Sequence, residues 1–309
     1  MSLTAARRAP WARDLLRVHR LEFPFPLAYV CHALWGACYA ATSPEQLLRA
    51  PVLLAVLANL IPLVAQNVLN AAIDIPVDVR TPGKSGIARA AIRLGRPQLI
   101  GIATAEMTLA LLLASALADH LHRPLIAVGV AGGILIEYLY NLEPVRLKKR
   151  GLANPVSLGA HFSVLPFIST ASAVRPDLAG YLWPLAFGLW FLLIGRTLWW
   201  SIPDASADRA SGLTPPAVRY GAERALLMAS ASTAVALVLL AWGLAWALNP
   251  VACVIGIAAA SLFLVSKVRL TATALRTLHE RHMRHRTLML VLVADALLVV
   301  LPITVNALR

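Results

Sequence analysis

Apolar residues in this chain gather into nine long stretches that are separated by short polar connections. A helix needs about 20 mostly apolar residues to cross the hydrocarbon core of a bilayer, because each residue adds about 1.5 Å. The stretches have that length, so the pattern predicts an all-α integral membrane protein with nine transmembrane helices. The predicted spans are residues 24–42, 51–72, 98–118, 124–141, 155–174, 179–202, 222–247, 251–269 and 287–307.

The composition supports a membrane environment for the whole chain. Hydrophobic residues make up 59% and charged residues 14% of the 309 residues, whereas soluble domains carry about 25% charged residues. The spans leave no room for a separate soluble domain, so we expect one membrane domain over residues 1–309, with residues 1–20 as a basic cytosolic segment. A basic start before an apolar stretch is also typical of a signal peptide. No small-residue cleavage site follows, so we expect a retained helix.

Basic residues fall on alternate connections between the spans. Lys and Arg in short loops favour the cytosolic side of a membrane. The N-terminal segment and the second, fourth, sixth and eighth connections, with their flanks, hold the 28 Lys and Arg residues except Arg49, Arg123, Arg175 and Arg309. This distribution predicts a multi-pass protein of the cell membrane with its N-terminus in the cytosol and its C-terminus outside.

The net charge of +13 raises nucleic-acid binding as an alternative. The basic residues are spread over separate short loops rather than gathered on one soluble face, so we expect no nucleic-acid partner. Orientation in the membrane and attraction to anionic membrane lipid explain the charge better. The three cysteines lie in apolar stretches without paired spacing, which indicates neither disulfides nor a zinc site.

Two groups of carboxylates fall where apolar stretches reach the predicted cytosolic face. Asn70, Asp74 and Asp78 follow the second stretch, and Asp204 and Asp208 follow the sixth. Residues four apart project from the same side of a helix, so each group forms an oxygen-bearing stripe. Magnesium takes six oxygen ligands, usually from one or two carboxylates, waters and phosphates. Two facing stripes with a diphosphate between them would satisfy it.

Solvated loop carboxylates are the alternative interpretation of either group taken alone. The two groups share their spacing, lie on one predicted face, and sit beside basic loops that can neutralise phosphate oxygens. Taken together, they favour a magnesium site whose candidate ligands are Asn70, Asp74, Asp78, Asp204 and Asp208.

These stripes and a third motif resemble the UbiA-type intramembrane prenyltransferases. Members of that superfamily carry Asn-x3-Asp-x3-Asp after the second helix and Asp-x3-Asp after the sixth. The segment from Tyr138 to Gly151 is similar to the family's Tyr/Pro/Arg-Leu-Lys-x-Arg-Gly stretch after the fourth helix. The resemblance extends over all nine spans. It implies helices around a central cavity open to the cytosol, and Mg2+-dependent transfer from a prenyl diphosphate donor to an aromatic or other lipophilic acceptor.

The resemblance also implies roles for individual residues. Magnesium on the carboxylates would stabilise the leaving diphosphate as a Lewis acid, so Asp74, Asp78, Asp204 and Asp208 are catalytic candidates. Aromatic faces can shield an allylic cation, a role expected for Tyr140. For Trp199 and Trp200, anchoring at the membrane interface is an equal alternative. The expected substrate-binding residues are Asn70, Lys84, Arg146, Lys148, Tyr138, Asn141 and Arg196.

Three charged residues lie deeper in the predicted spans. Glu106, Arg196 and Asp295 each fall about eight residues from the cytosolic end of a span, which is ~12 Å into the membrane. Charges at that depth need partners. We expect Arg196 to form a structural ion pair with Glu106 or Asp295, with a polar lining of the acceptor chamber as the alternative. His161 in the fifth span is expected to pack, and a role as a base is the alternative.

Three functions compete for this sequence. The first is prenyl transfer to an acceptor, and the second is cyclisation of the same cation, as in terpene cyclases of the superfamily. A membrane transporter is less favoured, because it should hold its main charges near the middle of the bilayer. A polar pocket around Arg196 would favour transfer, whereas a closed chamber lined by Trp residues would favour cyclisation.

Overall fold

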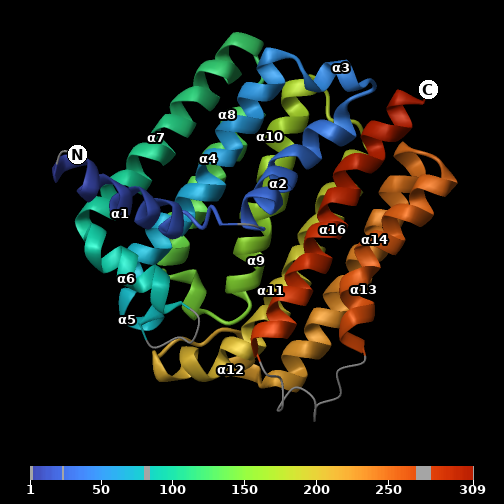
Figure 1. Ribbon diagram of the computed structural model, residues 1–309. Coiled ribbons are helices and arrows are strands. Elements are labelled where there is room, and N and C mark those ends of the chain that lie inside the picture. Colours follow the sequence, from blue (N-terminus) through green and yellow to red (C-terminus); the bar gives the residue numbers. More distant parts are fainter. Residues whose placement is uncertain (1–2, 23, 80–83, 269–279, 309) are drawn as a thin grey trace.

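The described part of the chain in the computed structural model is helical throughout (Figure 1). The structure describes residues 3–22, 24–79, 84–268 and 280–308. The helices are α1 (Leu3–Val18), α2 (Phe25–Ala40), α3 (Pro44–Leu47), α4 (Ala50–Ile73), α5 (Ile75–Asp78), α6 (Ser85–Leu94), α7 (Arg96–Leu121), α8 (Leu125–Asn141), η1 (Leu147–Lys149), α9 (Ala153–Gly159), η2 (Ala160–Val164), α10 (Leu165–Val174), α11 (Leu182–Ala210), α12 (Pro216–Tyr220), α13 (Ala222–Ala247), α14 (Pro250–Val268) and α16 (Glu280–Ala307).

Each of the nine predicted spans falls on a helical segment of the described residues. Six segments within these residues are long and apolar enough to cross a membrane: α4, α7, the run Ala153–Val174, α11, α13 and Thr287–Ala307 of α16. Leu125–Asn141 and Pro250–Leu262 are shorter apolar helices. The chain is therefore a multi-pass membrane protein, while the count of nine crossings, the sidedness and the central cavity stay predictions.

The long helices pack side by side in an order that closes on itself. α4 packs on α7, α7 on α8, α8 on α10, α9 on α11, α11 on α13, α13 on α14 and α14 on α16, and α16 returns to α2. α10 also packs against α2 and α4. Small residues allow close approach, as expected where helices meet in a membrane. Gly36 of α2 lies directly against the backbone of Phe167 in α10.

The fifth span is distorted near its middle. Between α9 and α10, residues Ala160–Val164 form a π-helical turn, in which the Leu165 N–H donates to the carbonyl of Ala160, five residues back. Pro166 follows and has no N–H to offer to an α-helical hydrogen bond. The wider turn brings His161 into the interior of the bundle, where its side chain is 2% exposed.

The two ends of the bundle differ in their short elements. Figure 1 shows α5 and α12 at one end, and α3 with the C-terminus at the other. α1 packs against α6, and the two helices are joined by the carboxylate of Asp14, which accepts hydrogen bonds from Arg93 Nε at 2.7 Å and Nη2 at 2.5 Å. Of the predicted eighth connection, residues 269–279 lie outside the described residues, whereas the part from Glu280 on belongs to α16.

Candidate active site

The first carboxylate stripe follows the end of α4. Asp74 is the single residue between α4, which ends at Ile73, and α5, which starts at Ile75 with Pro76 in its first turn. The proline separates the two helices, but the backbone bonds Asp74 N to Asn70 O and Asp78 N to Asp74 O, both 2.8 Å, keep the helical spacing. Asn70, Asp74 and Asp78 therefore stay on one side, as the sequence predicts.

Lys148 joins this stripe to the connection after α8. Its Nζ donates to Asp74 Oδ1 at 2.5 Å, to Asn141 Oδ1 at 3.1 Å and to Asn70 Oδ1 at 3.4 Å. Burial lowers the pKa of the Lys148 ammonium, and the Asp74 carboxylate beside it opposes that effect. Three acceptors match the three donors of an ammonium group, so Lys148 holds Asn70, Asp74 and Asn141 together.

Two further cations face the same carboxylates. Arg146 Nη2 lies 3.6 Å from Asp74 Oδ1, and Lys84 Nζ lies 3.7 Å from Asp78 Oδ1. Burial raises the pKa of Asp78; Lys84 opposes this rise and the neighbouring Asp74 adds to it. The structure thus brings two acids and Lys84, all from the connection after α4, together with Arg146 and Lys148 from the connection after α8.

The second stripe comes to the same place from α11. That helix continues through Pro203 to Ala210, further than the predicted span, and carries Asp204 and Asp208 on its last two turns. Asp208 interacts electrostatically with Asp204, Lys84, Asp74 and Lys148. The two stripes, 130 positions apart in the chain from Asp74 to Asp204, therefore meet at one end of the bundle.

The two tyrosines of the third motif point in different directions. Tyr140 is buried and lies near the side chains of Glu137, Asp74, Asp208 and Asn154. Tyr138 instead donates its hydroxyl to Thr104 of α7 at 3.1 Å. Residues two apart lie about 200° around a helix, so Tyr140 faces the carboxylates and the structure does not bring Tyr138 to them.

The tryptophans near the end of α11 belong to a packing cluster. Trp199 is 2% exposed and packs with Ile194, Leu198, Ala229 and Val291. Its ring meets that of Trp200 edge to face at 4.9 Å between centroids. This environment is that of packed helices rather than of a chamber lined by tryptophan.

Arg196 lies deeper, two helical turns before Asp204. Its Nη1 donates to Asp295 Oδ1 at 2.7 Å, and Asp295 Oδ2 accepts from His32 Nε2 at 3.4 Å. The expected ion pair of Arg196 with Asp295 is confirmed. Glu106 is not part of this ion pair. Its Oε1 lies 2.9 Å from Nε2 of His19, in the connection between α1 and α2. Arg196 is therefore apart from the carboxylate stripes, and its expected contact with substrate stays a prediction.

Glu137, which the sequence places near the Tyr140 face, and His161, for which packing is expected with a role as a base as the alternative, both adjoin the site. Glu137 Oε1 accepts from Asn141 Nδ2 at 2.5 Å, and its Oε2 lies 3.9 Å from His161 Nε2. The available signal was spacing: Glu137 and Asn141 are four apart on α8, which places them on one face. Their burial, 0% and 1% exposed, follows from packing that the sequence does not reveal.

The assembled site combines carboxylates, cations and buried polar groups at one end of a helical membrane bundle. These features place a cluster of charged groups beside the apolar interior of a multi-pass membrane protein. The chain belongs to the UbiA prenyltransferase family, whose model matches residues 29–303. No curated protein matches the sequence significantly.

Solved structures share this fold. A UbiA homolog from Archaeoglobus fulgidus bound to GPP and Mg2+ has a TM-score of 0.72 and 19% identity, over 95% of this chain and 99% of that chain. A UbiA homolog from Aeropyrum pernix K1, in apo form, has a TM-score of 0.69 and 16% identity, over 91% and 97%. Digeranylgeranylglyceryl phosphate synthase has 0.66 and 13%, over 95% and 99%. At these identities the likeness establishes the fold alone.

Proposed function

We propose that this protein transfers a prenyl group from a prenyl diphosphate to a lipophilic acceptor and releases diphosphate, with Mg2+ as cofactor. The observation that carries the proposal is the meeting of the two stripes, because Asp208 of α11, whose pKa burial raises, lies close enough to Asp74 at the end of α4 for the Asp74 carboxylate to raise that pKa further. Family membership supports it, as does the binding of GPP and Mg2+ by the Archaeoglobus fulgidus homolog.

The donor set fits magnesium completed by phosphate. No three His, Cys, Asp or Glu side chains within the described ranges gather closely enough to hold a metal alone. Magnesium needs just one or two carboxylates when phosphate oxygens and waters fill the other positions. Asn70, Asp74, Asp78, Asp204 and Asp208 would hold it. The bound ion would neutralise negative charge that develops on the leaving diphosphate.

The three cationic side chains, Lys148, Arg146 and Lys84, would have different roles in binding the diphosphate. Lys148 uses its donors on Asp74, Asn141 and Asn70, so it orients the first stripe and reaches phosphate by releasing one of these acceptors. Arg146 and Lys84 lie beyond hydrogen-bonding distance of Asp74 and Asp78. Both keep N–H donors for phosphate oxygens, and a guanidinium binds them in a bidentate manner.

The interior suits transfer better than cyclisation. Buried polar residues surround Arg196, including His32 and Asp295, whereas Trp199 is packed between helices. A hydrocarbon cation needs no such polar groups, but an acceptor with a polar head does. Tyr140, buried beside the carboxylates, would shield the allylic cation with its ring face. From the basic connections, we place the opening of the site on the cytosolic side.

The test is release of diphosphate by the purified protein in lipid nanodiscs with Mg2+. Dimethylallyl, geranyl, farnesyl and geranylgeranyl diphosphate are supplied in turn, each with and without a lipophilic acceptor. Release that requires an acceptor supports transfer. Release with a terpene product and no acceptor means cyclisation, and no release with any donor rejects the proposal and leaves transport as the alternative.

A further inference from the structure

A series of neighbouring polar side chains leads from the carboxylate stripes into the apolar interior. Lys148, bound to Asp74, donates to Asn141 Oδ1 at 3.1 Å, and Asn141 Nδ2 donates to Glu137 Oε1 at 2.5 Å. Glu137 Oε2 then faces His161 Nε2 across 3.9 Å. Polar groups are energetically costly in the hydrocarbon region of a membrane, so a connected series of them indicates a function.

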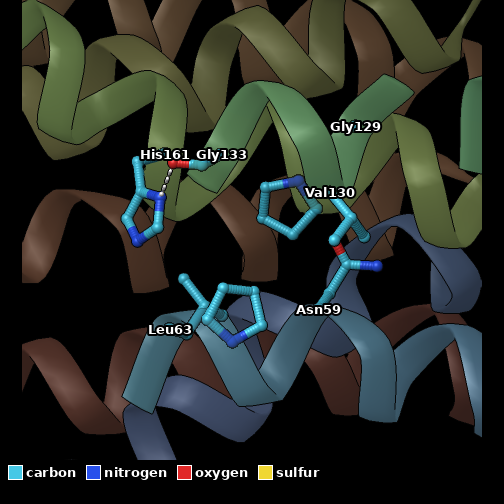
Figure 2. Close-up of a pocket in the computed structure, with 8 residues that line it drawn as sticks. Asn59, Leu63, Gly129, Val130, Gly133 and His161 are labelled. Carbon is cyan, nitrogen blue, oxygen red and sulfur yellow. Dashed lines mark hydrogen bonds between the residues drawn. The ribbon is translucent and has the colours of Figure 1, made fainter. Parts of the chain in front are cut away.

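The last two polar atoms of this series, Glu137 Oε2 and His161 Nε2, form no hydrogen bond with any described residue. Within the described part of the chain, neither Glu137 Oε2 nor His161 Nε2 has a hydrogen-bond partner, although both atoms are buried. His161 Nδ1 lies 3.1 Å from the carbonyl oxygen of Gly133, and a dashed line marks this hydrogen bond in Figure 2. Because a carbonyl only accepts, Nδ1 carries a proton, and in the neutral form of the imidazole Nε2 then presents its lone pair towards Glu137.

The backbone is shaped to hold His161 in this position. The π-helical turn Ala160–Val164 carries it, and π-helical turns are found frequently at functional sites. On the facing helix, a side chain at Gly129 would come within 2.7 Å of the Leu165 carbonyl, and one at Gly133 within 3.4 Å of His161 Nδ1. Glycine at these positions therefore lets α8 approach closely enough for the bond between His161 and Gly133.

The interior has room for a small group beside the imidazole. A cavity of ≈10 Å³ adjoins the His161 ring between α4, α8 and the fifth span; its lining includes Asn59, Leu63, Val130 and Gly133 but not Glu137 (Figure 2). About that volume holds one water-sized group. An oxygen about 2.8 Å from both Glu137 Oε2 and His161 Nε2 would sit to one side of the line that joins them.

We propose that Glu137 and His161 bind a hydroxyl group of the prenyl acceptor and remove its proton, which makes the acceptor a lipophilic phenol, enol or alcohol. This inference rests on the proposed prenyl transfer. The hydroxyl donates to His161 Nε2 and accepts from Glu137 when that carboxyl is protonated, so it satisfies both atoms. A carboxylate bound there would face Glu137 Oε2 and the lone pair of His161 with no hydrogen to share.

The proposed step is balanced. The bond between C1 and the diphosphate oxygen of the donor breaks, and its electron pair leaves with the diphosphate. The acceptor forms a new bond to C1 from its hydroxyl oxygen or from a conjugated carbon. The O–H bond breaks, its electrons stay with the acceptor, and its proton moves to His161 Nε2. Glu137 lies one helical turn, ~6 Å, from Asn141, which keeps the hydroxyl near the donor.

The experiment uses the full chain in nanodiscs with geranyl diphosphate and Mg2+. Two probe pairs differ only in the hydroxyl: 1-naphthol with 1-methoxynaphthalene, and geraniol with its methyl ether. Binding of each probe is measured by equilibrium dialysis, and prenylated product by radiolabel from the donor. The variants are Glu137→Gln, which keeps the oxygen that Asn141 contacts, and His161→Asn, which keeps an N–H for Gly133. Their matched controls are Glu45→Gln and His122→Asn, at exposed positions of the opposite end.

We expect a hydroxyl probe to bind more tightly than its ether and to be prenylated. Both variants should lose about 100-fold or more in product formation, with geranyl diphosphate affinity within about twofold of wild type. Loss of the acid limb of the pH–rate profile in His161→Asn separates a proton acceptor from a packing residue.

Equal binding of hydroxyl and ether probes, or product formation within threefold of wild type in both variants, would overturn the inference. A wild type that binds the hydroxyl probes selectively but never releases diphosphate would reject the proposed function and leave the hydroxyl site standing.

Discussion

Lys148 Nζ lies 2.5 Å from Asp74 Oδ1, although 74 positions separate the two residues in the chain. This contact joins the connection after α8 to the end of α4, and it fixes one carboxylate of the site before any ligand arrives. Lys148 is 5% exposed, so its charge is compensated by the protein rather than by water. Removing a partner of such a pair leaves a buried charge alone.

Replacement of Lys148 by Met should therefore destabilise the protein by about 3–5 kcal/mol. The neighbouring Lys149 is the control, because its side chain is 34% exposed and pairs with an exposed Glu143. Exposed pairs contribute about 0–1 kcal/mol, so Lys149→Met should change little. Thermal unfolding in one detergent measures both variants, and equal effects would show that Lys148 is not a buried anchor.

The carboxylate stripes should be essential for turnover. Asp74→Asn keeps an oxygen for Lys148, and Asp204→Asn is an equal change in the second stripe. Each should lower diphosphate release by at least about 100-fold and raise the Mg2+ concentration needed for half-maximal rate, since an amide is a weaker magnesium ligand than a carboxylate. Asp177→Asn, at an exposed position in the connection before α11, is the control. Full activity in either variant would remove that residue from the metal site.

The sequence was sufficient for the parts of the fold that depend on local pattern. Apolar stretches of membrane length located the long helices, and the spacing of Asn70, Asp74 and Asp78 correctly predicted one stripe. That spacing held because the backbone bonds from Asp74 and Asp78 continue across Pro76. Alternation of basic connections placed Asp74 and Asp208 at the same end of the bundle, where the structure brings them together.

What the sequence did not reveal depends on which helix faces meet. Tyr138 and Tyr140 belong to one motif, but Tyr138 donates a hydrogen bond to Thr104 of α7, whereas Tyr140 faces the carboxylates. His161 enters the interior through a π-helical turn, a local change of register without a distinctive residue pattern. Glu106 and Asp295 were equivalent partners for Arg196 by depth, and helix packing decided between them.

The buried pair of Arg196 and Asp295 offers a test of how the interior is stabilised. Asp295 is 0% exposed and Arg196 is 3% exposed. Asp295→Asn should cost about 3–5 kcal/mol, because the guanidinium loses its counter-charge. Arg196→Met with Asp295→Leu should recover most of that loss, since an apolar pair of similar volume is often neutral or stabilising. A double variant less stable than Asp295→Asn, by thermal unfolding, would contradict this account.

Attachment of α1 to the bundle should depend on pH through His19. Burial lowers the pKa of His19, but the hydrogen bond to the Glu106 carboxylate and that to the Leu15 carbonyl outweigh it, so the pKa is raised above 6.5. The added stability is therefore present below pH ~6.5 and is lost as pH rises through the raised pKa. Spin labels on α1 and α7 should report closer contact at pH 6 than at pH 9.

His19→Gln tests the origin of that pH dependence. Glutamine keeps a hydrogen-bond donor for Glu106 but does not titrate, so the distance between α1 and α7 should no longer change between pH 6 and pH 9. The pair of Asp14 and Arg93, which also holds α1, stays charged over this range. An unchanged pH response in His19→Gln would assign it to another group.

Close contact between α2 and α10 should make Gly36 intolerant of any side chain. A methyl group there would meet the Phe167 carbonyl and come within 2.6 Å of Thr170 Oγ1. Because the obstacle includes backbone, the helices must separate, and Gly36→Ala should destabilise the protein by about 1–3 kcal/mol or more. Gly101 of α7 is the control, since nothing lies within 4 Å of its added methyl group. Gly101→Ala should be neutral or stabilising by up to ~1 kcal/mol, because alanine is the better helix former. Thermal unfolding of the two variants in the same lipid separates helix propensity from contact, and a Gly36→Ala protein as stable as Gly101→Ala would show that α2 and α10 do not approach this closely.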